Sequence, residues 1–195
     1  MEGERDVTTK EITATFEENP IIAAVKDDGG LQHAILSECR TVFFLYGNIC
    51  DIPQKVELAK NAGKLVIVHT DLIEGLENRD IAARFIRSAT SADGIISTRS
   101  AIVKAAKEQE LVAIQRFFLI DSIALDNVRR HIEQGIPDLI EVLPALAPKI
   151  ISRLRAENSI PIIAGGLISD KEDVITALSA GASAVSTTKR ELWSL

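Results

Sequence analysis

Short apolar runs separated by polar, amphipathic stretches recur along the chain. The runs are rich in Val and Ile and do not alternate apolar with polar residues. Strands that are buried on both faces have this pattern, which is typical of parallel strands covered by helices. The pattern predicts eight buried strands, at residues 20–25, 41–45, 65–69, 94–97, 111–115, 139–143, 160–164 and 182–186.

The stretches between these runs predict helices. Residues 54–62 and 80–89 carry apolar residues at helical spacing among charged ones. Ser169, with Glu172 three residues later, predicts a capping box that begins the helix before the last strand. Three of the predicted helices end at a glycine that turns the chain into the next strand: Gly63, Gly135 and Gly181.

Eight strand–helix repeats predict an α/β fold, a (β/α)8 TIM-type barrel. The alternative, an open doubly wound sheet, usually has about five to seven strands. The chain of 195 residues is short for eight units, so we expect a compact barrel with short helices. Residues 20–195 are predicted to form this single domain and residues 1–19 an N-terminal extension. Within the extension, residues 8–18 are expected to form a helix that plugs the N-terminal mouth of the barrel.

Composition and charge exclude several classes of protein. Hydrophobic residues make up 46% and charged residues 26%, which is ordinary for a globular protein and not for a disordered chain. The net charge of −6 is opposite to that of a protein held to nucleic acid by bulk charge. The two cysteines, Cys39 and Cys50, fit a reducing compartment. No segment resembles a signal peptide or a membrane span, so the sequence predicts a cytoplasmic protein without a membrane partner.

The ends of the last two predicted strands carry the most specific local signal. In a barrel, function collects at the carboxyl ends of the strands, and the loops after strands seven and eight often bind phosphate. Gly165 and Gly166 leave the seventh strand, and Ser186 and Thr187 leave the eighth, ahead of a short helix expected at Lys189. Glycine lets a phosphate approach backbone N–H groups closely. We therefore expect phosphate binding by these four residues, although a tight turn and a helix cap would have the same sequence.

Other polar residues at predicted strand ends suit a small polar ligand. Lys26 follows the first strand, and His69 and Asp71 follow the third, where an imidazole can serve as an acid, a base or a hydrogen-bond donor. One residue of the pair Gln115–Arg116 must face inward. Glu141, in an apolar strand, needs a partner such as Lys26, Arg116 or a ligand hydroxyl. Structural roles for these side chains remain alternatives.

Several common sites lack sequence support. The three histidines are far apart, and there is no HExxH motif or paired CxxC, so no metal site is expected. Phosphate-binding nucleotide motifs and the GxSxG elbow are also missing. Basic residues recur on predicted helices, for example Arg129 with Arg130 and Lys104 with Lys107. These are expected to be solvated helix surfaces, although a composite patch across adjacent helices can hold RNA phosphates.

A set of phrases resembles a known family. These phrases are PIIAAVKD, FFLYGNI, VHTDLIEGL, DGIISTR, QRFFLIDSIAL, IEVLPAL and PIIAGGLI. They resemble the glycerol uptake operon antiterminator regulatory proteins, which are the glycerol-3-phosphate-responsive antiterminators of bacteria. The resemblance runs from about residue 20 to the end and is most distinctive in HTDLIEGL, DGIISTR and QRFFLIDS.

The resemblance implies a regulator without catalytic residues or a cofactor, with glycerol 3-phosphate as its effector. Such a protein acts on leader mRNA, so that transcription continues into genes for glycerol uptake and catabolism. It further implies that the phosphate lies at Gly165, Gly166, Ser186 and Thr187. The polyol end then meets His69, Asp71, Gln115 or Glu141, with Lys26 or Arg116 adding positive charge.

The oligomeric state is left open, a homo-oligomer included. A second hypothesis is a phosphosugar-binding TIM-barrel enzyme of the isomerase, aldolase or prenyltransferase type, since fold does not imply function.

Overall fold

The computed structural model describes residues 7–195 and contains a closed barrel of eight parallel strands in sequence order. Each strand pairs with the next, and β8 pairs with β1 to close the ring. The predicted (β/α)8 barrel is confirmed, and β5 extends three residues beyond its expected end. The strands are β1 Ile21–Val25, β2 Thr41–Phe44, β3 Leu65–His69, β4 Gly94–Ser97, β5 Val112–Phe118, β6 Leu139–Leu143, β7 Ile162–Gly165 and β8 Ala184–Thr187.

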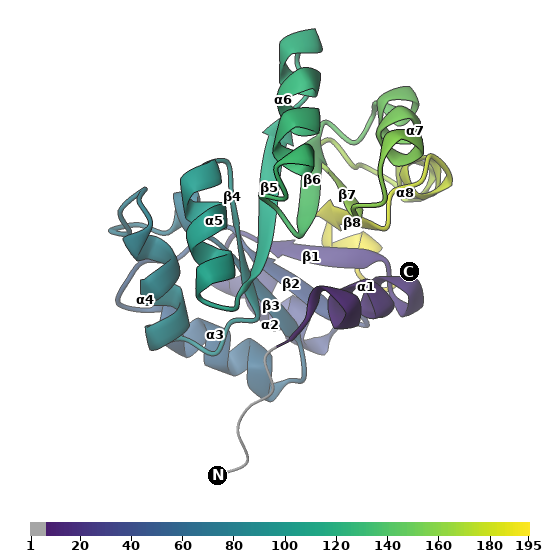
Figure 1. Cartoon of the computed structure of the whole chain (residues 1–195). Coiled ribbons are helices and arrows are strands. Elements are labelled where there is room, and N and C mark those ends of the chain that lie inside the picture. The colour runs from purple at the N-terminus through teal and green to yellow at the C-terminus, as the bar shows by residue number, and fades with distance from the viewer. Residues whose placement is uncertain (1–6) are drawn as a thin grey trace.

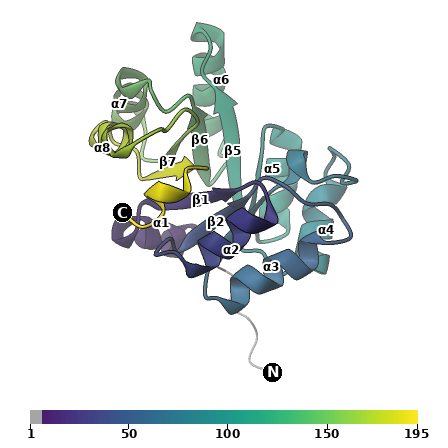
Figure 2. The same cartoon turned by 180° about the vertical axis from the view of Figure 1, so that it is seen from behind.

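Seven helices follow the first seven strands and surround the barrel, as Figures 1 and 2 show from opposite sides. They are α2 Asp28–Leu36, α3 Ile52–Asn61, α4 Ile81–Ala89, α5 Ser100–Glu108, α6 Ser122–Glu133, α7 Pro148–Glu157 and α8 Lys171–Ser179. Short 3₁₀ turns, η1 Thr70–Leu72 and η2 Arg190–Leu192, follow β3 and β8. The helix expected at Lys189 is therefore a single 3₁₀ turn. Across residues 7–195, no helix has the length and apolar character needed to cross a membrane.

The core has two layers because each strand buries both faces. Side chains such as Val25, Val42 and Ala113 pack between the strands and the outer helices. The other face of each strand fills the barrel with residues such as Ile67 and Ile114. This alternation of inward and outward side chains decides which polar residues reach the barrel interior.

Helix α1, Thr9–Glu18, belongs to the inner layer. Its buried residues Ile12 and Phe16 cluster with inward-facing residues of all eight strands. Partly buried Val7 and Leu65, before α1 and at the start of β3, pack against the same cluster. Helix α1 therefore closes the N-terminal mouth, as predicted. Residues 1–6 of the expected extension lie outside the described part of the chain.

Local sequence signals explain most element boundaries. Gly63, Gly135 and Gly181 have φ of 75°, 62° and 103°, the left-handed conformation that turns a helix end into a strand. The capping box expected from Ser169 to Glu172 is wrong by one residue. Asp170 is the N-cap of α8, and its Oδ1 accepts a hydrogen bond from Asp173 N at 3.0 Å. The Asp173 carboxylate in turn accepts from Ser169 N at 2.8 Å.

Candidate functional site

Strand β5 places an arginine inside the barrel and a glutamine outside it. Ile114 belongs to the barrel interior, whereas Ala113 and Phe117 pack in the layer beneath the outer helices. By strand alternation, Arg116 faces inward with Ile114, and Gln115 faces outward with Ala113 and Phe117. Gln115 is buried, with 1% of its surface exposed, on the side of the strand away from the barrel axis. The structure therefore separates Gln115 from the other candidate ligand residues.

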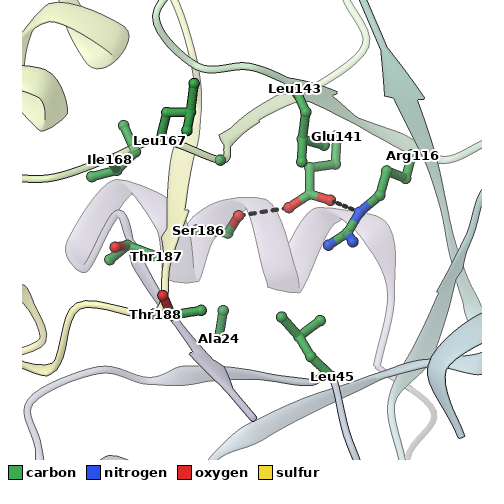
Figure 3. A pocket seen from close by; sticks show the side chains of 11 residues that line it. Ala24, Leu45, Arg116, Glu141, Leu143, Leu167, Ile168, Ser186, Thr187 and Thr188 are labelled. Carbon is green, nitrogen blue, oxygen red and sulfur yellow. Dashed lines mark hydrogen bonds and ion pairs between the residues drawn. The ribbon is translucent and has the colours of Figure 1, made fainter.

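Glu141 connects three strands at the carboxyl end of the barrel. It is fully buried on β6, opposite Arg116 in the register of β5 and β6. Arg116 Nε forms an ion pair with Glu141 Oε2, and Ser186 Oγ donates a hydrogen bond to Glu141 Oε1 at 2.6 Å. Figure 3 shows this chain of contacts, with the other two guanidinium nitrogens of Arg116 pointing away from the carboxylate. A buried carboxylate requires such partners, and both of its oxygens have one.

Gly165 makes room for this network. A Cβ atom at this position would lie 2.7 Å from Glu141 Oε1 and 2.7 Å from Ser186 Oγ. No side chain fits there unless the carboxylate or the hydroxyl moves. Gly165 was expected to leave space for a phosphate, but the space beside it is occupied by the hydrogen-bonded Glu141 carboxylate and Ser186 hydroxyl.

A pocket of about 140 Å³ opens beside the network, at the ends of β1, β2 and β5–β8. Its polar lining includes Arg116, Glu141 and the hydroxyls of Ser186, Thr187 and Thr188. Its remaining lining residues are Ala24, Leu45, Leu143, Gly166, Leu167 and Ile168. The lining combines an arginine–glutamate ion pair, hydroxyls and apolar walls, which suits a small polar ligand.

The two loops expected to bind phosphate meet in this pocket. Gly166 and Leu167 both have positive φ, 74° and 60°, which is uncommon for leucine. The Leu167 side chain is exposed to 69% of its surface. On the other loop, Trp193 Nε1 donates to Thr187 O at 2.9 Å and Lys189 N donates to Thr187 Oγ1 at 3.1 Å. The glycine and hydroxyl loops therefore lie side by side at the same end of the barrel.

His69 is a buried imidazole without a partner. It lies at the end of β3 on the inward face, in alternation with Ile67, and is 2% exposed. Neither ring nitrogen has a hydrogen-bond partner among residues 7–195. Burial, together with the charge of Arg116, lowers the pKa of His69 to about 4, so the ring is neutral at pH 7. A neutral imidazole has one donor and one acceptor to offer.

Asp71 has a full set of donors. Ser97 Oγ donates to Asp71 Oδ1 at 2.5 Å, and Thr98 donates to Oδ2 through its backbone N at 2.8 Å and its hydroxyl at 2.7 Å. Burial acts to raise the pKa of Asp71, but these hydrogen bonds hold that pKa below its ordinary value. The carboxylate joins β3 to β4 and adds a fixed negative charge near His69.

The structure thus brings together most of the residues selected from the sequence. Arg116, Glu141, Ser186 and Thr187 line one pocket with Gly166, and Gly165 lies behind Glu141. Lys26, directly after β1, is exposed and does not line this pocket, and neither do His69 and Asp71. Three further polar residues were not selected as site residues from the sequence, namely Thr188 in the lining and Ser97 and Thr98 around Asp71. Their signal was available, because each is a hydroxyl residue at a strand end.

A bound metal ion requires several His, Cys, Asp or Glu side chains close together. Within the described residues, no three His, Cys, Asp or Glu side chains are grouped closely enough to hold a metal ion.

Comparisons with known proteins agree on one family. Residues 21–193 match the family model described as glycerol-3-phosphate responsive antiterminator. An uncharacterized Escherichia coli (strain K12) protein, YgcP, is 45% identical over 178 residues, covering 91% of this chain and 93% of YgcP.

Two solved structures of glycerol uptake operon antiterminator or antiterminator-related proteins are similar to this chain. The glycerol uptake operon antiterminator regulatory protein of Listeria monocytogenes is 35% identical, with a TM-score of 0.86 over 90% of this chain and 95% of that one. A glycerol uptake operon antiterminator-related protein of Thermotoga maritima is 34% identical, with a TM-score of 0.79 over 89% of this chain and 96% of that one. Barrel enzymes at 17% identity or less share the fold alone. The chain belongs to the glycerol-3-phosphate responsive antiterminator family.

Proposed function

We propose that this protein is a ligand-sensing regulator that binds glycerol 3-phosphate at the carboxyl end of the barrel. With the ligand bound, it acts on leader mRNA and allows transcription of genes for glycerol uptake and catabolism. Action on a growing transcript would place it in the cytoplasm. The observation that carries the proposal is the pocket that the glycine and hydroxyl loops line together with Arg116, at the end of a barrel whose inward face also buries the unpartnered His69.

The phosphate end is assigned to the loops after β7 and β8. Gly166 and Thr187 line the pocket, and the Thr187 hydroxyl, which accepts from Lys189 N, still has its own proton to donate. Ser186 uses its proton on Glu141, so it supports the site through that carboxylate. Lys26 and Lys189 are exposed directly after the paired strands β1 and β8, where they add positive charge for a dianion.

The polyol end is assigned to the inner side, near His69, Asp71 and Arg116. A buried polar group without a hydrogen bond costs about 1–3 kcal/mol, so a ligand hydroxyl that bonds to His69 regains that free energy. The ring is neutral, and the Arg116–Glu141 pair is neutral as a unit. This environment favours uncharged hydroxyl groups over a second anionic group.

The enzyme alternative has less support from the geometry. Catalysis on a phosphosugar requires a carboxylate, imidazole or amine that is free to move a proton. Glu141 is engaged by Arg116 and Ser186, and Asp71 is engaged by Ser97 and Thr98. The imidazole of His69 has no partner among the residues described, but its pKa of about 4 leaves it without an imidazolium proton to donate at pH 7. Turnover of triose or pentose phosphates by the purified protein would reverse this preference.

A thermal-shift titration with glycerol 3-phosphate tests the ligand, with glycerol and inorganic phosphate as comparison compounds. At about 100 times its dissociation constant, a ligand stabilises the native state by about 2.7 kcal/mol. For a chain of this size, that raises Tm by roughly 5–10 °C. No shift at millimolar glycerol 3-phosphate would contradict the proposal.

The variant His69→Leu tests a residue assigned to the polyol end. It removes a group that makes no hydrogen bond in the unliganded protein, so Tm should stay the same or rise while affinity falls at least tenfold. Thr41→Val is the matched control, because Thr41 Oγ1 is also buried without a partner but lies at the N-terminal end of β2. Unchanged affinity in His69→Leu, or an equal loss in Thr41→Val, would refute the assignment.

A further inference from the structure

Two exposed cations lie unpaired on neighbouring helices. Lys104 projects from α5 and Arg130 from α6, and both side chains are exposed. Neither has a hydrogen-bond or ion-pair partner within residues 7–195. Their neighbours differ, because Lys107 on α5 and Arg129 on α6 are both ion-paired with carboxylates. The sequence alone did not distinguish the free cations from the paired ones.

The charges of both cations affect the pKa of one histidine, His131 on α6. Lys107 Nζ donates to Gly135 O at 3.1 Å, which ties the end of α5 to the end of α6. Burial, then the charges of Arg130 and Lys104, lower the pKa of His131. Both charged groups acting on this ring are cations, although the chain carries a net charge of −6. We call Lys104 and Arg130 the α5–α6 cationic face.

We propose that the α5–α6 cationic face binds phosphate groups of the RNA on which this protein acts. The inference rests on the proposed function, because it names the surface for the partner which that function requires. RNA is held mainly through its phosphates, and a chain with excess negative charge needs a local positive surface for such binding. Unpaired cations of this kind can release the counterions of a phosphate backbone without first breaking an ion pair.

This face is connected to the ligand site through one strand. The Phe117 ring packs against the His131 ring with their centroids 5.6 Å apart. Phe117 directly follows Arg116, which lines the ligand pocket from the opposite face of β5. Ligand binding at Arg116 can therefore reach α6 through the adjacent aromatic contact.

Strand β5 and helix α6 also contain buried polar atoms that lack hydrogen-bond partners among residues 7–195. Gln115 Oε1 and His131 Nδ1 are buried without hydrogen-bond partners in the described part of the chain. Of the twelve residues of α6, Val128 is the one that is fully buried. Buried polar atoms without partners and sparse packing mark elements of low local stability. Helix α6 is thus suited to a second position, which ligand-dependent RNA affinity requires.

The test measures binding of a leader transcript from the glycerol-utilisation operon, with and without glycerol 3-phosphate, at several salt concentrations. Each lost phosphate contact lowers the slope of log K against log salt by about 0.7 and weakens binding roughly fivefold at 0.1 M salt. The double variant Lys104→Gln/Arg130→Gln should therefore bind about 25-fold more weakly. Both side chains are exposed, so its thermal shift with glycerol 3-phosphate should be unchanged.

The control is the double variant Lys149→Gln/Lys171→Gln, which removes the same charge from exposed lysines on α7 and α8. Neither helix carries the cationic face, so this control should bind almost as the wild type does. If the cationic-face variant binds RNA with normal affinity, or the control loses as much affinity, the assignment of this RNA-binding surface is refuted while the proposed antiterminator function stands. If the wild type binds no leader RNA in either ligand state, both proposals are refuted.

A second variant tests the connection to the ligand. Phe117→Leu should leave RNA binding without ligand nearly unchanged and reduce the ratio of RNA affinities with and without glycerol 3-phosphate. Phe85→Leu is the matched control, because Phe85 on α4 is also a partly buried core aromatic. A full ligand effect in Phe117→Leu would show that the connection does not run through this contact.

Discussion

The substitution Gly165→Ala adds one methyl group where the barrel interior has no space. The new Cβ would lie 2.7 Å from both Glu141 Oε1 and Ser186 Oγ, well inside van der Waals contact. Either the hydrogen bond between these atoms breaks or β7 moves. Overpacking of this kind costs about 1–3 kcal/mol, and loss of a hydrogen bond to a charged group costs about 1.5–3 kcal/mol. We expect a loss of roughly 3–5 kcal/mol in the free energy of unfolding.

The matched control separates the steric effect from the backbone effect. Gly63 has φ of 75°, and a Cβ there would meet nothing within 4 Å. Gly63→Ala should therefore cost only the left-handed penalty, about 1–2 kcal/mol. Urea denaturation monitored by circular dichroism measures both losses, and Tm should fall by roughly 10 °C in Gly165→Ala. If Gly165→Ala is no less stable than Gly63→Ala, the proposed conflict with the Glu141–Ser186 hydrogen bond is refuted.

Three further predictions concern the buried groups. The native pKa of His69, about 4, lies below the unfolded value near 6.5. The free energy of unfolding that depends on this histidine is therefore at its full value above pH 6.5 and is lost as the pH falls towards 4, because the unfolded state binds the proton more readily. That loss amounts to about 3 kcal/mol, and His69→Leu should remove it from a pH series of urea denaturation; identical pH profiles would contradict the assigned pKa. Glu141→Gln should destabilise by about 3–5 kcal/mol because Arg116 loses its buried partner, whereas the same change at exposed Glu157 should have little effect in the same assay. Burial raises the pKa of Cys39 to about 11, so a thiol reagent should label Cys50 in the native protein and Cys39 only after unfolding; rapid labelling of both would refute this.

Much of the candidate site followed from strand order and residue type. Polar residues after apolar runs pointed to the carboxyl end of the barrel, and four of them, Arg116, Glu141, Ser186 and Thr187, line one pocket there. Arg116 was predicted from the sequence as one possible partner of Glu141, besides Lys26 and a ligand hydroxyl, because a buried carboxylate needs a cation or a hydrogen-bond donor. The alternation within β5 excluded Gln115 from the interior, and this depended on which face of the strand the closed barrel buries. Sequence periodicity alone cannot decide between two adjacent polar residues.

The start of helix α8 was also predicted only in part from the sequence. At the start of α8, Ser169 with Glu172 matches the capping-box pattern, but the N-cap in the structure is Asp170. The position of the N-cap depends on where the loop after β7 meets the helix, and that loop passes through Leu167 in a left-handed conformation. A non-glycine residue in this conformation gives no signal in sequence.

By itself, the sequence determined the barrel, because runs of Val and Ile buried on both faces require helices on one side and a filled interior on the other. It also determined which end carries the polar residues, since parallel strands bring their carboxyl ends to one rim. Only the tertiary structure decided the contacts: the pairing of Arg116 with Glu141 and Ser186, the isolation of His69, and the freedom of Lys104 and Arg130. Those outcomes depend on strand register and on the distances between residues far apart in the chain, which arise when the sheet closes.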